Sequence, residues 1–313
     1  VLNEQMDRIG LPGQRNVISA NGQAGIYVDG NLAYGNRFEN NHIGTDITGT
    51  VSRGNSTGVS IGSAPGTIIG GPAPGEGNLI SGHATGIHIF NLDAQAIGGL
   101  YNAVVQGNII GLNATGTAAI GNTSNIHINN DFNLIGGTTS GAGNVISGGA
   151  VAIELRAGAD GNVVQGNTIG LNAAGTVGIA NASGVVIGDA ATNNVVGGTV
   201  AGARNVISSN VDGVVITGAA ATNNQVAGNY NGFNEAGTAA VGPGTWGVLV
   251  TQGASNNTIG GTVAGAGNVI SGQSQAAVSL NHGATGTLVQ GNLIGRNAAD
   301  TATLGNNYGV VVQ

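Results

Sequence analysis

A short phrase recurs along the whole chain and constrains its fold more than any other sequence feature. The phrase is Asn-Val-Ile-Ser or a close variant, with copies beginning at Asn16, Asn78, Asn144, Asn205 and Asn268. The intervals between these copies are 62, 66, 61 and 63 residues. A related phrase, usually Asn-x-Ile-Gly, falls between them, at Asn41, Asn108, Asn167, Asn229 and Asn292. The chain is therefore an array of about ten units of about 31 residues each, a period typical of repeat proteins.

Each unit contains three short apolar segments, which in one unit begin at Asn194, Asn205 and Gly213. Segments of about four residues with alternating polarity, bounded by Gly and Asn, predict β-strands. Three strands per unit predict an all-β parallel β-helix, a solenoid of about ten coils stacked roughly 4.8 Å apart. In this arrangement the repeated Ile points inward, and the repeated Asn shares that face and bonds to its copies in adjacent coils.

Composition excludes several other classes of protein. A net charge of −7 without a basic run argues against nucleic-acid binding, which depends on Lys and Arg neutralising phosphates. No apolar run approaches the roughly 18 residues of a membrane-spanning helix. The absence of Cys excludes a disulfide framework.

The repeat resembles that of bacterial right-handed parallel β-helix proteins of the pectate-lyase-like superfamily. The resemblance rests on the Asn-Val-Ile-Ser phrases and covers residues 15–313. It implies a right-handed coil. It also implies a function connected with polysaccharides, because the superfamily includes lyases, hydrolases, epimerases, tailspikes and non-catalytic surface repeats. The regular repeats and the scarcity of charged residues separately indicate a secreted or cell-surface rod.

The two ends of the chain give separate expectations. Leu2, Met6 and Ile9 have the spacing of an amphipathic helix, which predicts a helical cap over residues 1–12 and a single solenoid domain over residues 13–313. The sequence stops inside an apolar strand at Gln313. We therefore expect either a longer chain or a last coil that stacks on another molecule.

The outward residues of the third strand of each unit predict a candidate site. His88, His127 and Glu154 fall on successive coils, about 5 Å apart, and Arg156 lies in the next outward column. As a site, His127 would act as general acid or base, with Glu154 raising its pKa. Arg156 would bind a carboxylate, such as that of a uronic acid polymer. The alternatives are a metal site formed by the two His and the carboxylate, or a polar ladder on a solvated face.

Three further side chains extend this candidate site. Tyr27 and Phe90 are placed to stack on sugar rings, and Asn129 follows Phe90 in the same outward column. Together they predict a glycan-binding surface beside the ionisable groups.

A column of aspartates follows successive third strands, at Asp93, Asp131, Asp160 and Asp189. Stacked carboxylates repel one another unless a cation lies between them, so a Ca²⁺ site is one interpretation. The other is that each Asp caps the backbone of its own turn.

Farther along the outward column the residues become aliphatic, at Val186, Val215, Leu249 and Val311, and other outward positions such as Leu134, Val163, Val195 and Leu288 are apolar too. An exposed aliphatic strip predicts an interface, such as self-association with another rod. Scattered surface aliphatics without function are the alternative.

Two functions are therefore expected. The first is a structural, adhesive or glycan-binding rod. The second is a polysaccharide-active enzyme, a lyase, epimerase or hydrolase, with its site on the outer face of the third strands. The chain departs from the enzymes of the superfamily because it contains no Lys and no close pair of Asp residues.

Overall fold

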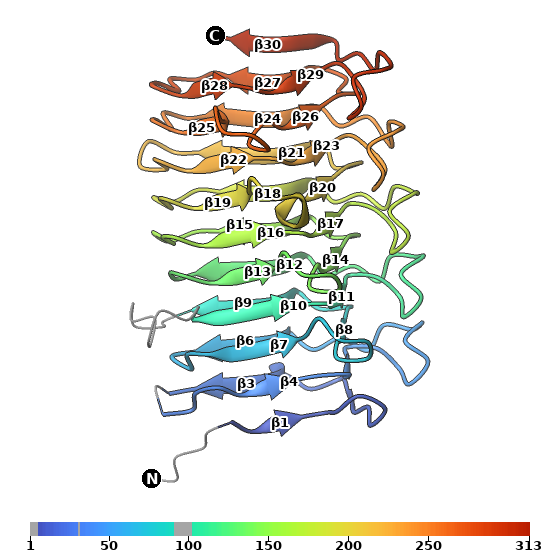
Figure 1. Ribbon diagram of the computed structural model, residues 1–313. Helices are drawn as coiled ribbons and strands as arrows, with labels where there is room; N and C mark the ends of the chain where they lie inside the picture. Colours follow the sequence, from blue (N-terminus) through green and yellow to red (C-terminus); the bar gives the residue numbers. More distant parts are fainter. Residues whose placement is uncertain (1–5, 31, 91–101) are drawn as a thin grey trace.

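The protein is a right-handed parallel β-helix of about ten coils (Figure 1). The structure is a computed structural model and describes residues 6–30, 32–90 and 102–313. Three parallel sheets of ten strands each run along the rod. Within the described residues the one helix is a 3-10 turn, η2 (Ala201–Ala203), and no helix is long and apolar enough to cross a membrane.

Every coil contributes one strand to each sheet. The first sheet consists of β1 (Arg8–Ile9), β4 (Arg37–Phe38), β7 (Thr67–Gly70), β10 (Ala103–Gln106), β13 (Leu134–Gly136), β16 (Val163–Gln165), β19 (Val195–Gly197), β22 (Gln225–Ala227), β25 (Thr258–Gly260) and β28 (Leu288–Gln290). The second sheet consists of β2 (Val17–Ile18), β5 (His42–Ile43), β8 (Leu79–Ile80), β11 (Ile109–Ile110), β14 (Val145–Ile146), β17 (Thr168–Ile169), β20 (Val206–Ile207), β23 (Tyr230–Asn231), β26 (Val269–Ile270) and β29 (Leu293–Ile294). The third sheet consists of β3 (Ala24–Asp29), β6 (Thr57–Gly62), β9 (Thr85–Phe90), β12 (Ser124–Asn129), β15 (Val151–Leu155), β18 (Ser183–Ile187), β21 (Asp212–Thr217), β24 (Trp246–Thr251), β27 (Ala276–Leu280) and β30 (Tyr308–Val312).

The interior of the rod is a stack of aliphatic side chains. The repeated Ile of the second sheet is almost fully buried in coil after coil, as at Ile43, Ile80 and Ile110, each with no exposed surface. Inward residues of the other two sheets, such as Ile69 and Ile87, join the same cluster. Burial of this continuous apolar column is the main stabilising contribution that the coils share.

A ladder of ten asparagines runs beside the aliphatic column. Its members are Asn16, Asn41, Asn78, Asn108, Asn144, Asn167, Asn205, Asn229, Asn268 and Asn292. Each Nδ2 donates to the Oδ1 of the next member, at donor–acceptor distances of 2.8 to 3.0 Å. The sequence prediction of stacked Asn side chains is therefore confirmed, and their buried amides are satisfied as burial requires.

Two columns of loops project from the rod. Hairpins at residues 44–53, 111–120, 170–179, 232–241 and 295–304 follow alternate strands of the second sheet and stack on one another (Figure 1). The backbone N–H of Ala114 in one hairpin, for example, donates to the carbonyl of Gly49 in the preceding one, at 2.9 Å.

The second loop column precedes the second sheet on alternate coils, at residues 71–77, 137–143, 198–204 and 261–267. These loops also touch each other closely. At Gly141, which has a φ of +82°, an added Cβ would lie 2.2 Å from the carbonyl oxygen of Pro72 in the preceding loop. The outer face of the second sheet therefore lies between two walls of loops.

The helical cap predicted over residues 1–12 is wrong where the structure describes it. Arg8–Ile9 form strand β1, which pairs in parallel with Arg37–Phe38 of β4. Residues 1–5 lie outside the described residues. Backbone pairing with the next coil outweighs the helical spacing of the apolar residues, because it satisfies main-chain groups that a short helix would leave open.

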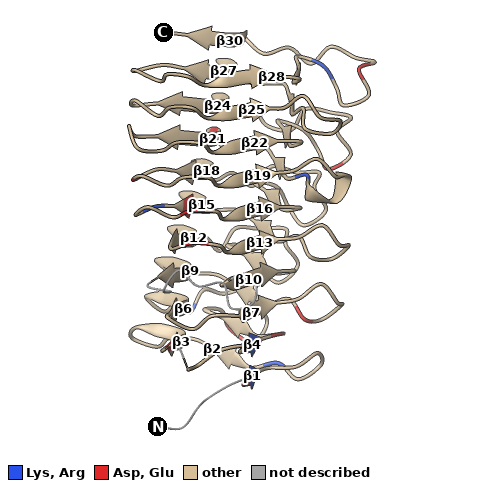
Figure 2. Cartoon of the chain, turned by 60° about the vertical axis from the view of Figure 1, so that its left-hand side comes forward, with Lys and Arg blue, Asp and Glu red and all other residues tan. Residues whose placement is uncertain are grey.

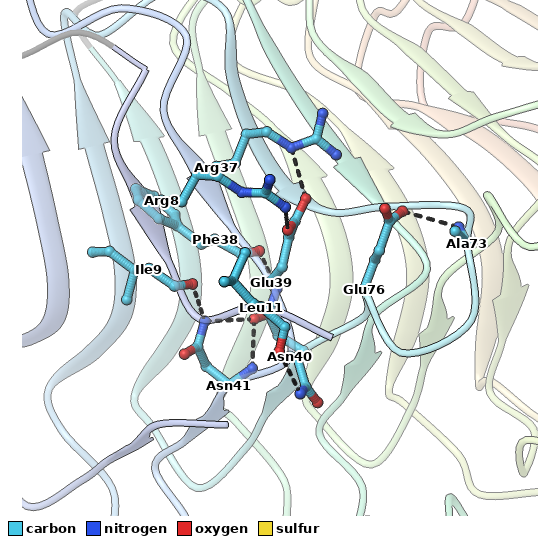
Figure 3. Close-up of polar contacts among 11 residues, drawn as sticks. Arg8, Ile9, Leu11, Arg37, Phe38, Glu39, Asn40, Asn41, Ala73 and Glu76 are labelled. Carbon is cyan, nitrogen blue, oxygen red and sulfur yellow. Dashed lines mark hydrogen bonds and ion pairs between the residues drawn. The ribbon is translucent and has the colours of Figure 1, made fainter. Parts of the chain in front are cut away.

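A buried carboxylate joins the first two coils. The side chain of Glu39 has no exposed surface and binds both Arg8 and Arg37, the latter through Nε at 2.6 Å (Figure 3). Burial acts to raise the pKa of Glu39, but the hydrogen bonds and charges of the two arginines lower it below its ordinary value. Glu39 is thus a buried structural anion that is paired with two arginines.

Candidate functional site

The structure brings three of the predicted site residues into one column on the third sheet. His127 of β12 lies directly opposite His88 of β9 on one side and Glu154 of β15 on the other. Their side chains point outward, because the residues on either side of each, such as Ile126 and Ile128, are buried in the core. Charged residues are sparse along the chain (Figure 2).

Glu154 is the centre of a hydrogen-bonded group. Its Oε1 accepts from His127 Nδ1 at 2.6 Å and from Ser124 Oγ at 2.7 Å, and its Oε2 lies 3.5 Å from Arg156 Nε. Burial acts to raise the pKa of Glu154, but the hydrogen bonds from His127 and Ser124, with the charges of His127 and Arg156, lower it to about 2. The carboxylate is therefore ionised at neutral pH, and its Oε1 accepts two hydrogen bonds.

His88 belongs to a group of rings. Its imidazole stacks on Phe90, with ring centroids 4.7 Å apart, and meets His127 edge-on at 5.0 Å. Burial and the nearby His127 lower the pKa of His88, against the opposing effect of Glu154. Its Nε2 is buried and has no hydrogen-bond partner.

The three predicted binding residues lie on the same face. Asn129 is directly opposite Phe90, and its Oδ1 is buried without a partner. The Phe90 ring reaches over Gly62, where an added Cβ would lie 3.0 Å from Phe90 Cζ and 2.9 Å from an Asp29 oxygen. Asp29 accepts a hydrogen bond of 3.0 Å from the hydroxyl of Tyr27, a ring that is 61% exposed. Aromatic and polar groups therefore run without a break from the first coils to β15.

The aspartates that follow the third strands bind protein groups. Asp131 accepts a hydrogen bond of 2.8 Å from the backbone N–H of Asp160. Asp160 in turn accepts from Thr192 Oγ1 and Asn193 Nδ2, both at 2.6 Å, and Asp189 lies 3.5 Å from the guanidinium of Arg156.

These contacts link the carboxylates of Asp131 and Asp160 to the following coil, not to the backbone of their own turns as the capping interpretation expects. The described part of the chain has no group of three or more His, Cys, Asp or Glu residues that could hold a metal ion. Asp93, the first member of the predicted column, lies outside the described residues.

The aliphatic strip occupies the same column farther along the rod. Val186, Val215 and Leu249 are only 6%, 9% and 9% exposed, and Val151 and Trp246 pack against them. The strip faces outward as predicted, but its members cover one another and leave less apolar surface open than the sequence indicates. Self-association through it stays a prediction.

The other apolar positions differ among themselves. Leu134 is 9% exposed, Val163 and Val195 are half-buried, and Leu288 is 56% exposed. They therefore form no uniform surface.

A second group of polar residues, which the sequence analysis missed, lies over the second sheet between the loop columns. Arg204 stacks on the ring of Tyr230 with its Cζ 3.9 Å from the centroid. Glu235, from a hairpin, accepts a hydrogen bond of 3.1 Å from Thr168 on the sheet. One feature of the repeat points to this surface: Arg15 and Arg204 precede ladder asparagines, a position that is Gly in most units.

The chain matches no family model, no curated protein and no solved structure.

Proposed function

We propose that the protein is a non-catalytic, secreted or cell-surface solenoid that binds an extended glycan along the third sheet. In this proposal it is similar to the surface repeats of the pectate-lyase-like superfamily. The glycan lies on the outer face from Tyr27 to Arg156, across successive coils. The observation that carries the proposal is the fixed row of rings and charged groups on β9, β12 and β15.

The aromatic rings supply the apolar contacts of such a site. Phe90 and the exposed Tyr27 present faces on which the C–H groups of sugar rings stack. One coil, that of β6, lies between these rings along the rod, so one chain of sugars contacts both only if it lies parallel to the rod axis. A long, shallow surface of this kind suits a polymer better than a single sugar.

The charged groups supply selectivity. Arg156 is 28% exposed and contacts Glu154 and Asp189 only at 3.5 Å, so its guanidinium retains donors for a ligand. A guanidinium forms paired hydrogen bonds with a carboxylate. The expected ligand is therefore a glycan that contains uronic acid residues.

The state of Glu154 argues against this residue acting as a general acid. A general acid must hold a proton near neutral pH, and a carboxyl group with a pKa of about 2 does not. Three neighbouring groups occupy the carboxylate, so its role is to hold His127, Ser124 and Arg156 in position.

The test is a binding assay against acidic and neutral polysaccharides, followed by variants. We expect a uronic acid polymer to bind, and Phe90→Ala and Arg156→Gln each to weaken binding by about tenfold, equal to about 1.4 kcal/mol. Arg53→Gln removes the same charge from an exposed arginine outside the row and serves as the control. Absence of binding to every polymer would refute the function, and binding unchanged in both variants would refute the site.

One observation favours a second candidate, a polysaccharide lyase, epimerase or hydrolase. His127 Nδ1 bonds to Glu154 at 2.6 Å, an arrangement that orients an imidazole so that its other nitrogen can transfer a proton. Product analysis after incubation with each polymer distinguishes the two candidates. New chain ends or an inverted sugar that His127→Ala abolishes would support the enzyme, whereas binding without turnover supports the proposed function.

A further inference from the structure

A cavity of about 410 Å³ lies over the second sheet, on a different face of the rod from the glycan-binding row. Leu79 of β8 and Ile109 of β11 form its floor. Pro72 and Pro74 of one loop column and Ala114 of a hairpin form its sides. The volume is within the range of small-molecule sites, and the lining is largely apolar.

One buried polar side chain that lines this cavity has a ring nitrogen without a hydrogen-bond partner. His42 on β5 is 5% exposed, and its Nδ1 makes no hydrogen bond. Burial and the charge of Arg15 lower the pKa of His42. A hydrogen bond with the backbone of Asp46 and the charge of Asp46 act in the opposite direction and raise it. The imidazole is therefore largely neutral at pH 7, and its free nitrogen is a buried polar atom that a ligand can satisfy.

Arg15 supplies the charge of the cavity. It is exposed, lines the opening and forms no ion pair with any residue that the structure describes. No carboxylate lines the cavity. The neighbouring Glu76 turns toward its own loop, where it accepts a hydrogen bond of 3.0 Å from the backbone N–H of Ala73 (Figure 3). The site is therefore suited to an anion and has no group that would neutralise a cation.

We propose that this cavity binds a small hydroxycarboxylic acid with an apolar body. The guanidinium of Arg15 holds the carboxylate, and the ligand hydroxyl bonds to His42 Nδ1. The apolar body rests on Leu79 and Ile109, between Pro72 and Ala114. This site shares no residue with the row on the third sheet, so it is independent of the proposed glycan binding.

Calorimetry on the full chain with matched small acids tests each part of the proposal. Mandelate carries the carboxylate, the hydroxyl and an apolar ring. Phenylacetate lacks only the hydroxyl, and we expect it to bind about fivefold more weakly, the effect of one hydrogen bond of about 1 kcal/mol. Mandelamide lacks the charge and should bind at least about tenfold more weakly. Glucuronate, which has the carboxylate on a polar ring, should bind more weakly than mandelate.

Two variants connect these differences to the named residues. In His42→Leu the ratio of mandelate to phenylacetate affinity should fall to near one, while phenylacetate still binds. In Arg15→Gln the preference for mandelate over mandelamide should disappear, whereas Arg53→Gln should retain it.

Several results would overturn the proposal. They are no saturable binding of mandelate, equal affinity for mandelate and phenylacetate in the unmodified protein, or tighter binding of glucuronate. The ligand series alone decides these points, so the test does not depend on the folding of a variant. Because the ligands are single small acids, a failure here is distinguishable from failure of the polymer to bind the third sheet.

Discussion

The outer face of the third sheet has two halves that share one backbone and carry opposite chemistry. On β9, β12 and β15 the central outward column is His88, His127 and Glu154. On β18, β21 and β24 the same column, in unbroken register, is Val186, Val215 and Leu249. The strands pair in the same way in both halves, and the core beneath both is aliphatic.

The two halves hold their side chains in place by different means. In the polar half, hydrogen bonds between neighbouring coils centre on Glu154, whereas His88 Nε2 and Asn129 Oδ1 are buried without a partner. The aliphatic half packs its side chains against each other until 9% or less of each is exposed. In a solenoid, the interior therefore fixes the fold, and the outer columns are free to carry either a site or a simple packed surface.

We expect the largest loss of stability when a charge is placed in the aliphatic half. Val215→Asp buries a carboxylate between Val186 and Leu249, where nothing pairs with it. We expect the free energy of unfolding to fall by about 2–4 kcal/mol. Urea denaturation measures this difference.

The matched control is Val200→Asp, at a loop position that is 58% exposed. This variant should change stability by less than about 0.5 kcal/mol. If Val215→Asp is equally mild, the strip is not the packed, dry cluster described above, and the contrast between the two halves is lost.

Most of the fold could be predicted from the sequence because the units pair in register. When identical coils stack, residues at the same place in the repeat become neighbours in space. His88, His127 and Glu154 are 27 to 39 residues apart in the chain, yet alignment of the repeats alone places them side by side. The same reasoning predicts the Asn ladder.

The features that the sequence analysis did not predict lie where the repeat is interrupted. Ser124 joins Glu154 although it is three residues before His127, because Asn125 and Ile126 both turn inward and interrupt the alternation of the strand. The cavity beside His42 is formed by inserted loops, which have no strand period from which to place their side chains. Each miss has a physical cause in local backbone geometry.

We expect a smaller loss of stability when Glu154, in the polar half, becomes protonated at low pH. Its pKa is lowered from 4.5 to about 2, so its stabilising effect is complete above pH 4.5 and is lost as the pH falls through about 2. The shift corresponds to at most about 3–4 kcal/mol, which solvent screening at this partly exposed site reduces to about 1–3 kcal/mol.

Urea denaturation at pH 5 and near pH 2 measures this effect, with Glu154→Gln as the control that cannot ionise. The unmodified protein should lose about 1–3 kcal/mol more than Glu154→Gln between these pH values. Parallel losses in the two proteins would show that the contacts of Glu154 do not favour its charged form, and the polar half would then lack its organising ion.

We expect the smallest change in stability when side chains of the polar half are replaced by those of the aliphatic half. Glu154→Val alone leaves His127, Ser124 and Arg156 without their shared acceptor, and should cost about 1–2 kcal/mol. The double variant His127→Val with Glu154→Val continues the column of Val186. Its stability should be within about 0.5 kcal/mol of that of the unmodified protein, because packed aliphatics replace a hydrogen-bonded ion pair at little net cost.

A double-mutant cycle measured by urea denaturation gives the coupling between the two positions. Simple additivity of the two single changes would mean that His127 and Glu154 do not act as a unit, and that the two halves differ only in composition.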